Sequence, residues 1–258
     1  MAKFFKGFYQ YRFLLWELTK KGIKLKYRRS YLGIVWSLLE PLLTMMVLSV
    51  VFGTLFGNSD RTFPVYILTG RLLYSFFSAA TKSSVKAIRA NAAMIKKVYV
   101  PKYLYPLSSI LFNFIIFLIS LIVLVGVMMV FGVVPTVYIL QAPIALVLLL
   151  ILSVGVGMIL ATLGVYFRDM EYLWEVALML VMYTCAIFYK PERLMQSGWA
   201  WLLKFNPLYC CIATFRSAIF GEMMNIQYAL YALVFGLVSL LVGVYFFYKK
   251  QDGFILQI

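Results

Sequence analysis

Few residues in this sequence could carry out chemistry of their own. The 258 residues include no histidine, which removes imidazole bases, His-ligated metals and most zinc sites. Cys185, Cys210 and Cys211 lack metal-ligand or redox spacing, so we interpret them as packing residues. No Gly-x-x-x-x-Gly-Lys-Ser/Thr loop is present to hold nucleotide phosphates. We therefore expect no catalytic residue, no metal and no cofactor bound by this chain, and an energy source elsewhere.

One charged cluster allows two interpretations. Asp169 and Glu171 lie two residues apart beside Arg168. This spacing is weakly similar to the metal-binding motif of enzymes that use sugar nucleotides. With nine acidic residues in all and no soluble domain to hold such a substrate, we favour a structural latch at the inside membrane surface. In this latch Arg168 and Asp169 pair with charges on the N-terminal helix, such as Glu17 or Arg28.

The composition is typical of a membrane protein. Hydrophobic residues make up 64% of the chain and charged residues 13%, against about 45–50% and 25% in soluble domains. The net charge of +15 could suggest a nucleic-acid partner. The basic residues lie beside apolar runs rather than along one soluble face, however, and this placement argues against nucleic acid.

Six apolar runs predict an all-α, polytopic membrane protein with six transmembrane helices. A helix needs about 20 apolar residues to span the roughly 30 Å hydrocarbon core. Basic residues crowd into the first 29 positions, and Lys249 and Lys250 follow the last run. Because basic flanks stay on the cytoplasmic side, both termini are predicted to be cytoplasmic. The predicted spans are roughly 34–56, 64–81, 105–131, 138–166, 173–190 and 227–248.

The N-terminal segment, residues 1–30, is predicted to form an amphipathic helix. Its apolar side chains recur at intervals of three, four and seven, which places them on one stripe: Phe4, Phe8, Tyr11, Leu15, Leu18 and Leu25. Basic residues fall on the other side, as expected for a helix that lies in the cytoplasmic interface of a membrane. The helix either anchors the chain only or also braces a partner protein.

Two further segments are unusual for simple connections. Residues 85–100 are predicted to form one short basic helix that ends before Pro101. This segment is either a solvated connection between two spans or, as we favour, a helix that docks a partner protein. Residues 191–221 are too broken by Pro191 and Pro207 to span, yet too apolar for a loop in water. Short amphipathic or re-entrant helices at the outer face satisfy both observations.

In the fourth span, the small residues Ser153, Gly157 and Ala161 lie four apart and favour close helix packing.

Two ionisable residues, Glu40 and Arg71, fall inside predicted spans. An arginine at a helix centre costs on the order of 2.5–3.5 kcal/mol on insertion scales, so such residues usually face protein or water. Three arrangements are open: a direct pair, snorkelling or interhelical hydrogen bonding, and a place on a substrate path. In each arrangement we expect both side chains to point away from lipid.

Several segments together resemble the type-2 ABC exporter permeases that move bacterial surface polysaccharides such as O-antigen, capsule and wall teichoic acid. The resemblance covers essentially the whole chain. It is carried by Lys26-Tyr27-Arg28-Arg29-Ser30-Tyr31-Leu32-Gly33 with Trp36, Pro41-Leu42, Val51-Phe52 and Leu55-Phe56, by Tyr166-Phe167-Arg168-Asp169 with Glu171, and by Asn206-Pro207-Leu208 leading to Phe215-Arg216. Arg71 departs from the apolar residue expected at its position.

The resemblance implies a transport subunit that is not itself an enzyme. It implies a homodimer in the bacterial cytoplasmic membrane, bound to membrane lipids and to two cytoplasmic ABC ATPase subunits that hold ATP and Mg²⁺. The substrate would be an undecaprenyl-linked glycan. Residues 1–30 would be the interface helix and 191–221 the outer-face gate helices. Residues 85–100 would be the coupling helix, with its ATPase contacts at Arg89, Met94, Ile95 and Lys96.

Aromatic residues make up 18% of the chain and give this substrate class modest independent support, because sugar faces stack on aromatic rings. Most of these residues are explained equally well as core and membrane-interface residues. The candidate substrate path consists of Trp36, Glu40, Tyr66, Arg71, Tyr74, Phe77 and Tyr183.

An alternative to polysaccharide export is that the chain is an ABC-2 permease for a lipid, drug or peptide. A membrane acyl- or glycosyltransferase is opposed by the lack of histidine and of acidic clusters.

Overall fold

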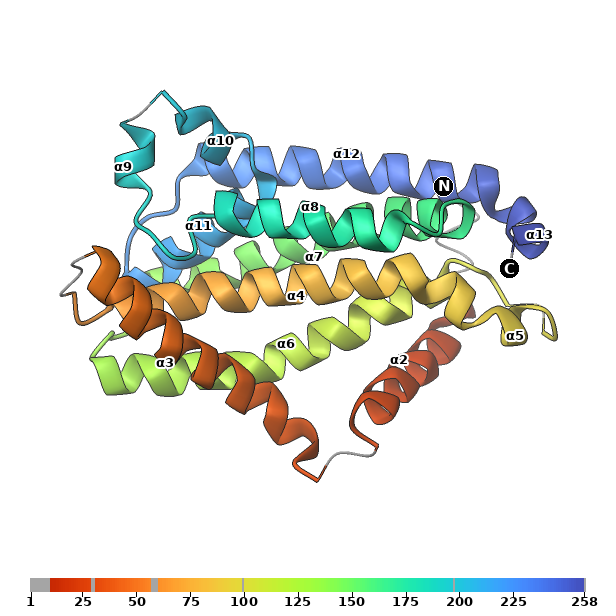
Figure 1. The fold of residues 1–258 in the computed structure, drawn as a ribbon, viewed down its shortest axis with the longest axis horizontal. Coiled ribbons are helices and arrows are strands. Elements are labelled where there is room, and N and C mark those ends of the chain that lie inside the picture. The colour runs from red at the N-terminus through yellow and green to blue at the C-terminus, as the bar shows by residue number, and fades with distance from the viewer. Residues whose placement is uncertain (1–9, 29–30, 57–59, 99, 197, 258) are drawn as a thin grey trace.

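The described part of the chain is built from helices. In a computed structural model, residues 10–28, 31–56, 60–98, 100–196 and 198–257 are described, and no strand forms among them. This confirms the all-α prediction for those residues. The long helices run roughly along the long axis of the molecule, and α3 is tilted away from that direction (Figure 1). They are α3 (Trp36–Phe56), α4 (Phe63–Ala90), α6 (Leu104–Phe131), α7 (Ala142–Tyr166), α8 (Met170–Thr184) and α12 (Ile226–Lys250).

The short helices gather at the two ends of this bundle. α9 (Glu192–Met195) and α10 (Ala200–Lys204) lie at one end, which we call the α9 end (Figure 1). α5 (Ala92–Ile95), α13 (Phe254–Gln257) and the C-terminus lie at the opposite end, the α5 end. α2 (Arg12–Tyr27) packs along α6, and α11 (Pro207–Phe220) packs against α7 and α12.

Four of the six predicted spans are confirmed as helical stretches long and apolar enough to cross a membrane. They are Gly33–Leu55, Leu104–Phe131, Val137–Tyr166 and Ile226–Gly253. The predicted span at 64–81 lies within α4, which is long enough but carries four basic residues. The predicted span at 173–190 was wrong in its bounds, because α8 has 15 residues and ends at Thr184. A membrane span needs about 20 residues, so the six-span topology stays a prediction.

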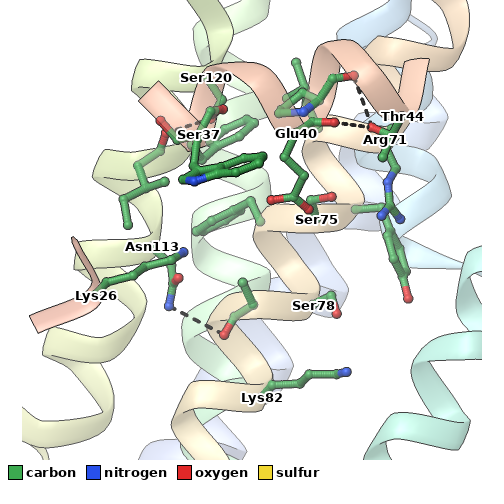
Figure 2. A pocket seen from close by; sticks show the side chains of 18 of the residues that line it. Lys26, Ser37, Glu40, Thr44, Arg71, Ser75, Ser78, Lys82, Asn113 and Ser120 are labelled. Atoms are coloured by element: carbon green, nitrogen blue, oxygen red, sulfur yellow. Dashed lines mark hydrogen bonds between the residues drawn. The ribbon is translucent and has the colours of Figure 1, made fainter. Parts of the chain in front are cut away.

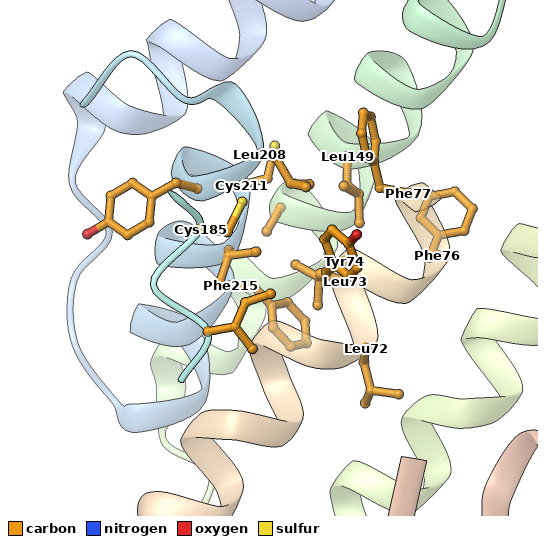
Figure 3. Packing of buried hydrophobic residues seen from close by; sticks show 14 of the residues in the cluster. Leu72, Leu73, Tyr74, Phe76, Phe77, Leu149, Cys185, Leu208, Cys211 and Phe215 are labelled. Carbon is orange, nitrogen blue, oxygen red and sulfur yellow. The ribbon is translucent and has the colours of Figure 1, made fainter. Parts of the chain in front are cut away.

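The core is organised around α4, which contacts α3, α6, α7, α8 and α11. Its buried side chains join a cluster that includes Tyr74, Phe77, Leu149 and Phe215 (Figure 3). Cys185, Cys210 and Cys211 are free thiols in the same cluster and are fully enclosed. The three cysteines therefore pack the core, as their spacing indicated.

Glycines allow α7 and α12 to approach closely. A Cβ atom on Gly155 would lie 2.4 Å from Ser239 Oγ and 2.5 Å from the backbone nitrogen of Leu240. The small-residue face of α7 turns toward other helices. Gly157 lies against Ile110 of α6, where an added Cβ would meet Ile110 Cδ1 at 2.8 Å, and Ser153 and Ala161 are fully buried. The predicted packing role of that face is confirmed.

The described part of the N-terminal segment is a helix, α2, that packs against protein on one side. Leu15 is 5% exposed and Leu18 packs beside it, whereas Leu25, expected on the same stripe, is 58% exposed. A Cβ on Gly22 would lie 2.7 Å from Phe112 Cδ1, so α2 and α6 are in close contact. Phe4 and Phe8 of the predicted stripe lie outside the described residues.

The prediction of one helix over residues 85–100 was wrong in its bounds. α4 continues without a break to Ala90 and then ends at Asn91, after which α5 forms a single turn. Asn91 donates its side-chain Nδ2 to the carbonyl of Ala87 at 2.8 Å, and its backbone nitrogen donates to Ile88 at 3.2 Å. A side chain that competes in this way for helix carbonyls is a common helix terminator.

Residues 191–221 form three helices, α9, α10 and α11. α11 begins where Asn206 Oδ1 accepts hydrogen bonds from the backbone nitrogens of Leu208 and Tyr209, at 3.0 and 3.3 Å. Pro207 occupies the first helical position, where no backbone donor is needed. The Asn-Pro-Leu sequence is thus explained as a helix N-terminus. Whether these helices re-enter a membrane stays a prediction.

Candidate functional site

A cavity of about 400 Å³ opens between α3, α4, α6 and the C-terminal end of α2. Most of its polar side chains come from α3 and α4 (Figure 2). Aromatic rings complete the lining, among them Trp36 and Tyr74. The polar residues are Lys26, Ser37, Glu40, Thr44, Arg71, Ser75, Ser78, Lys82, Asn113 and Ser120.

A polar stripe on α4 forms one wall of the cavity. Arg71, Ser75, Ser78 and Lys82 follow each other at intervals of four, three and four residues, which places them on one helix face. The same periodicity continues beyond the cavity through Lys86 and Arg89 toward the α5 end. The stripe therefore carries four cations, a large number for a helix at the centre of the bundle.

Two carboxylates of α8 neutralise the half of this stripe that lies nearer the α5 end. Glu171 binds Lys86 at 2.7 Å and also accepts a hydrogen bond from Arg89. Glu175, one turn further along α8, binds Lys82 Nζ at 3.0 Å. The hydrogen bond to Glu171 raises the pKa of the Lys86 ammonium above its ordinary value. Each of the three cations nearest the α5 end thus has a carboxylate partner.

Arg71, the fourth cation, forms no salt bridge with a carboxylate in the part of the chain that the structure describes. The same face of α8 continues to Leu178 and Met182, at the next intervals of three and four residues. Leu178 uses its carbonyl to accept a hydrogen bond from Tyr74 at 2.8 Å. Met182 presents its sulfur to Arg71 Nη1 at 3.8 Å, and the guanidinium lies 5.9 Å from the centre of the Tyr74 ring.

Glu40 and Arg71 line the same cavity without forming a salt bridge with each other. The direct pair, one of the three arrangements considered, is therefore absent from the structure. Lys26 also lines the cavity, and burial lowers the pKa of its ammonium group while the charge of Glu40 raises it. Figure 2 shows Glu40 of α3 and Arg71 of α4 on the walls of the same cavity.

The cavity brings together four of the seven candidate path residues, namely Trp36, Glu40, Arg71 and Tyr74. The other three lie elsewhere. Phe77 is buried, with its ring 6.4 Å from that of Trp174. Tyr183 is 56% exposed on α8. Tyr66 lines a different pocket, at the α9 end. These three residues do not line the cavity that the other four share, because aromatic character alone does not show which way a ring points. Their place on a substrate path stays a prediction.

Sequence reasoning missed the polar residues that complete the cavity, above all Lys82 and Asn113. The spacing of Arg71, Ser75, Ser78 and Lys82 was a readable signal, since it marks one helix face. Asn113 is an amide within a predicted span and was another. Its Nδ2 donates to Ser83 Oγ at 3.0 Å and so joins α6 to α4.

The second pocket, of about 440 Å³, surrounds Arg216 at the α9 end. Arg216 is 7% exposed and donates to the carbonyls of Ala186 and Tyr66, at 2.9 and 3.1 Å. Its guanidinium lies 3.5 Å from the centre of the Tyr66 ring, whose hydroxyl donates to the same Ala186 carbonyl at 3.1 Å. Arg216 Nε also donates to Thr69 Oγ1 at 3.4 Å, so three of the five N–H donors are used and the residue holds α11 to α4.

The predicted latch is found only in part. Glu171 does tie α8 to another element, but that element is α4 rather than the N-terminal helix. Arg168 and Asp169 are exposed and form no salt bridge among the described residues. Glu17, an expected partner, binds Lys20 three residues away. The pairing with α2 was therefore wrong.

The predicted ATPase contacts do not share one exposed face. Arg89 turns toward Glu171 of α8, and Ile95 is 8% exposed within the smaller core cluster. Met94 packs partly against that cluster, whereas Lys96 is exposed at the α5 end. The helix break at Asn91 explains the difference, because Arg89 and the residues after Asn91 belong to two different helices and do not share one helical periodicity.

Comparison with known proteins gives consistent matches over most of the chain. Residues 13–220 match the ABC-2 type transporter family. The O-antigen export system permease protein RfbA of Klebsiella pneumoniae is 28% identical over 242 residues, 93% of each chain. The protein of the same name from Myxococcus xanthus is 28% identical and covers 86% of this chain and 85% of its own. The polysialic acid transport protein KpsM of Escherichia coli is 25% identical, with 96% and 97% covered.

Proposed function

The chain belongs to the ABC-2 type transporter family, and on this premise we propose that it is the membrane permease of an exporter for a lipid-linked surface polysaccharide. One observation carries the proposal: the chain aligns over more than nine-tenths of its length with an O-antigen export system permease protein and with a polysialic acid transport protein, which are named for two different polysaccharides. A teichoic-acid polymer belongs to the same chemical class of lipid-linked cargo.

In this proposal the α5 end faces the cytoplasm, as do both termini. Lys96 and Lys97 are exposed there, and Val98 is 53% exposed. This basic rim would receive two ATPase subunits, which hold the ATP and Mg²⁺. The chain itself offers no phosphate-binding loop for that purpose.

A second copy of the chain would complete the transport path. Apolar side chains are exposed along α8 at helical spacing, including Leu173 at 62%, Val176 at 61% and Leu180 at 64%. The tilted helix α3 exposes Val47 and Val50 in the same way, at 62% and 67%. Lipid could cover these faces, but helices that enclose a path for a polar polymer need a partner surface as well.

The test is reconstitution of the purified chain in lipid vesicles with a separately produced ABC ATPase subunit and a lipid-linked glycan. We expect glycan to cross the membrane only when chain, ATPase and ATP are all present. We also expect the lone chain to show no ATP turnover. Transport of an unrelated lipid, drug or peptide with no movement of the glycan would overturn the proposal, and so would robust ATP turnover by the lone chain.

A further inference from the structure

We propose that the cavity between α3, α4 and α6 binds the phosphate-bearing headgroup of a lipid, with Arg71 as its principal ligand. As an account of the exported polymer's carrier lipid, this inference rests on the proposed function. Three features of the cavity support the headgroup site: the N–H donors of Arg71 that lack an acceptor among the described residues, the surplus of positive charge and the size of the space.

The register between α4 and α8 leaves Arg71 available. Along α8, one face presents Glu171, Glu175, Leu178 and Met182 in turn. The two carboxylates on this face bind basic residues of α4. At the level of Arg71 the face ends in the thioether of Met182, which is a weak acceptor. A guanidinium has five N–H donors, and among the described residues that of Arg71 makes a single hydrogen bond, to this sulfur at 3.8 Å.

The charges that line the cavity favour an anion. Of the described residues, three cations line it, Lys26, Arg71 and Lys82, against one carboxylate, Glu40. Lys82 Nζ is paired with Glu175 at 3.0 Å and Glu40 is not paired with Arg71, so a surplus of positive charge remains around the guanidinium. Arginine binds phosphate oxygens through two parallel hydrogen bonds, which makes a phosphate group the best match.

The size and surroundings of the cavity point to a headgroup of a lipid rather than to a polymer. About 400 Å³ is near the lower end of the range for small-ligand sites, too small for a length of polysaccharide. Beside the cavity residues Glu40 and Thr44, α3 exposes Leu43 at 49% and Val47 at 62%. A hydrocarbon tail can lie along this apolar flank while its phosphate reaches Arg71.

The test uses the full chain together with its ATPase in nanodiscs of phosphatidylcholine. The probe is a short prenyl diphosphate, compared with the prenyl alcohol of the same length and with inorganic pyrophosphate. We expect the prenyl diphosphate to bind at least about tenfold more tightly than either, because the alcohol lacks the charge and pyrophosphate lacks the tail. Equal binding of the alcohol would overturn the phosphate site, and equal binding of pyrophosphate would overturn the lipid.

Variants of the cavity separate binding from folding. Arg71→Leu should weaken diphosphate binding about tenfold, whereas Arg61→Leu, which removes an exposed arginine before α4, should not. Met182→Glu should weaken binding as much as Arg71→Leu, by supplying the missing carboxylate, while Met182→Leu keeps it within about twofold. Glu40→Gln should strengthen binding about threefold, a gain that misfolding cannot produce. Wild-type binding by both Arg71→Leu and Met182→Glu would overturn the inference.

The same preparation distinguishes this inference from the proposed function. Anionic phospholipid, added as phosphatidylglycerol, competes with the prenyl diphosphate if the site accepts any lipid phosphate, and that outcome supports the headgroup site. If the complex moves no glycan but binds the probe with this charge dependence, the headgroup site stands and the proposed function fails. If both Arg71→Leu and Met182→Glu bind the probe like wild type while the complex exports glycan, the proposed function stands and the headgroup site fails.

Discussion

Arg89 and Glu171 join the end of α4 to the first turn of α8 by a charge-assisted hydrogen bond. Their side chains are 23% and 27% exposed, so water screens the pair less than a pair on the surface. Glu171 also lies where the dipole of α8 favours a negative charge. The bond fixes the register that brings Glu175 to Lys82 and Met182 to Arg71.

The Arg89–Glu171 pair is expected to stabilise the folded chain measurably. A double-mutant cycle with Arg89→Met and Glu171→Gln, read out by thermal unfolding in detergent, should give a coupling of about 1–3 kcal/mol. The control pair is Lys20–Glu17, with side chains 54% and 46% exposed. Its coupling should be under about 1 kcal/mol. Equal couplings for the two pairs would show that Arg89–Glu171 is no more than a surface contact.

Asp60 should give the chain a measurable stability dependence at acid pH. Its carboxylate accepts hydrogen bonds from the backbone nitrogen and hydroxyl of Thr62, at 2.9 and 2.8 Å, and these bonds lower its pKa. Because the unfolded chain binds the proton more readily, this stabilisation is present above the ordinary pKa of 3.8 and is lost as pH falls below it. The side chain is 37% exposed, so the effect should be under about 1 kcal/mol.

The measurement is the unfolding temperature of wild type and Asp60→Asn across this acid range. Wild type should lose stability more steeply than Asp60→Asn as the pH falls. Parallel curves for the two proteins would contradict the assignment.

Gly155 should tolerate no side chain, because the backbone of α12 lies against it. In Gly155→Ala the new Cβ would meet Ser239 Oγ and the nitrogen of Leu240 at 2.4 and 2.5 Å, so the helices must separate. We expect a loss of about 1–3 kcal/mol in the free energy of unfolding. Gly126→Ala is the matched control, since nothing lies within 4 Å of its Cβ position. It should gain up to about 1 kcal/mol from helix propensity, and a loss of the same size in both variants would contradict this.

Part of the fold could be predicted because its signals are local. Long, mostly apolar runs identify the four stretches that are long and apolar enough to span a membrane. The bounds of α4 were not predictable in the same way. The basic residues from Lys82 onward suggested that a span had ended, yet the helix continues to Ala90, and Glu171 and Glu175 of α8 pair with these residues. Neutralisation by a distant segment is tertiary and leaves no periodicity in the sequence.

The candidate site, like the fold, was predictable from local sequence only in part. Glu40 and Arg71 stood out because ionisable residues are rare in apolar runs, and both do line the cavity. Their failure to pair depends on how α3 tilts against α4, which composition does not encode. Trp36 and Tyr74 also reached the cavity, whereas Phe77 turned into the core. The direction of an aromatic ring depends on its neighbours across the bundle, such as Trp174 for Phe77.

Arg216 should resist replacement even by lysine. It is buried and donates to two carbonyls, one of them from Ala186, which has a backbone φ of 48° that non-glycine residues rarely adopt. Lysine keeps the charge but cannot reach both acceptors with a planar fork or stack in the same way on Tyr66. The strained turn at Ala186 would then lose one of the contacts that hold it in place.

We therefore expect Arg216→Lys to lower the free energy of unfolding by about 2–3 kcal/mol. Thermal unfolding in detergent measures this, with Lys204→Met as the control because Lys204 is exposed on the neighbouring helix α10. The control should change stability by less than about 0.5 kcal/mol. If Arg216→Lys unfolds like wild type, a single charge suffices at this position. The fork of hydrogen bonds to Ala186 and Tyr66 would then contribute no net stability to the junction of α11 and α4, because water or a shifted lysine replaces it.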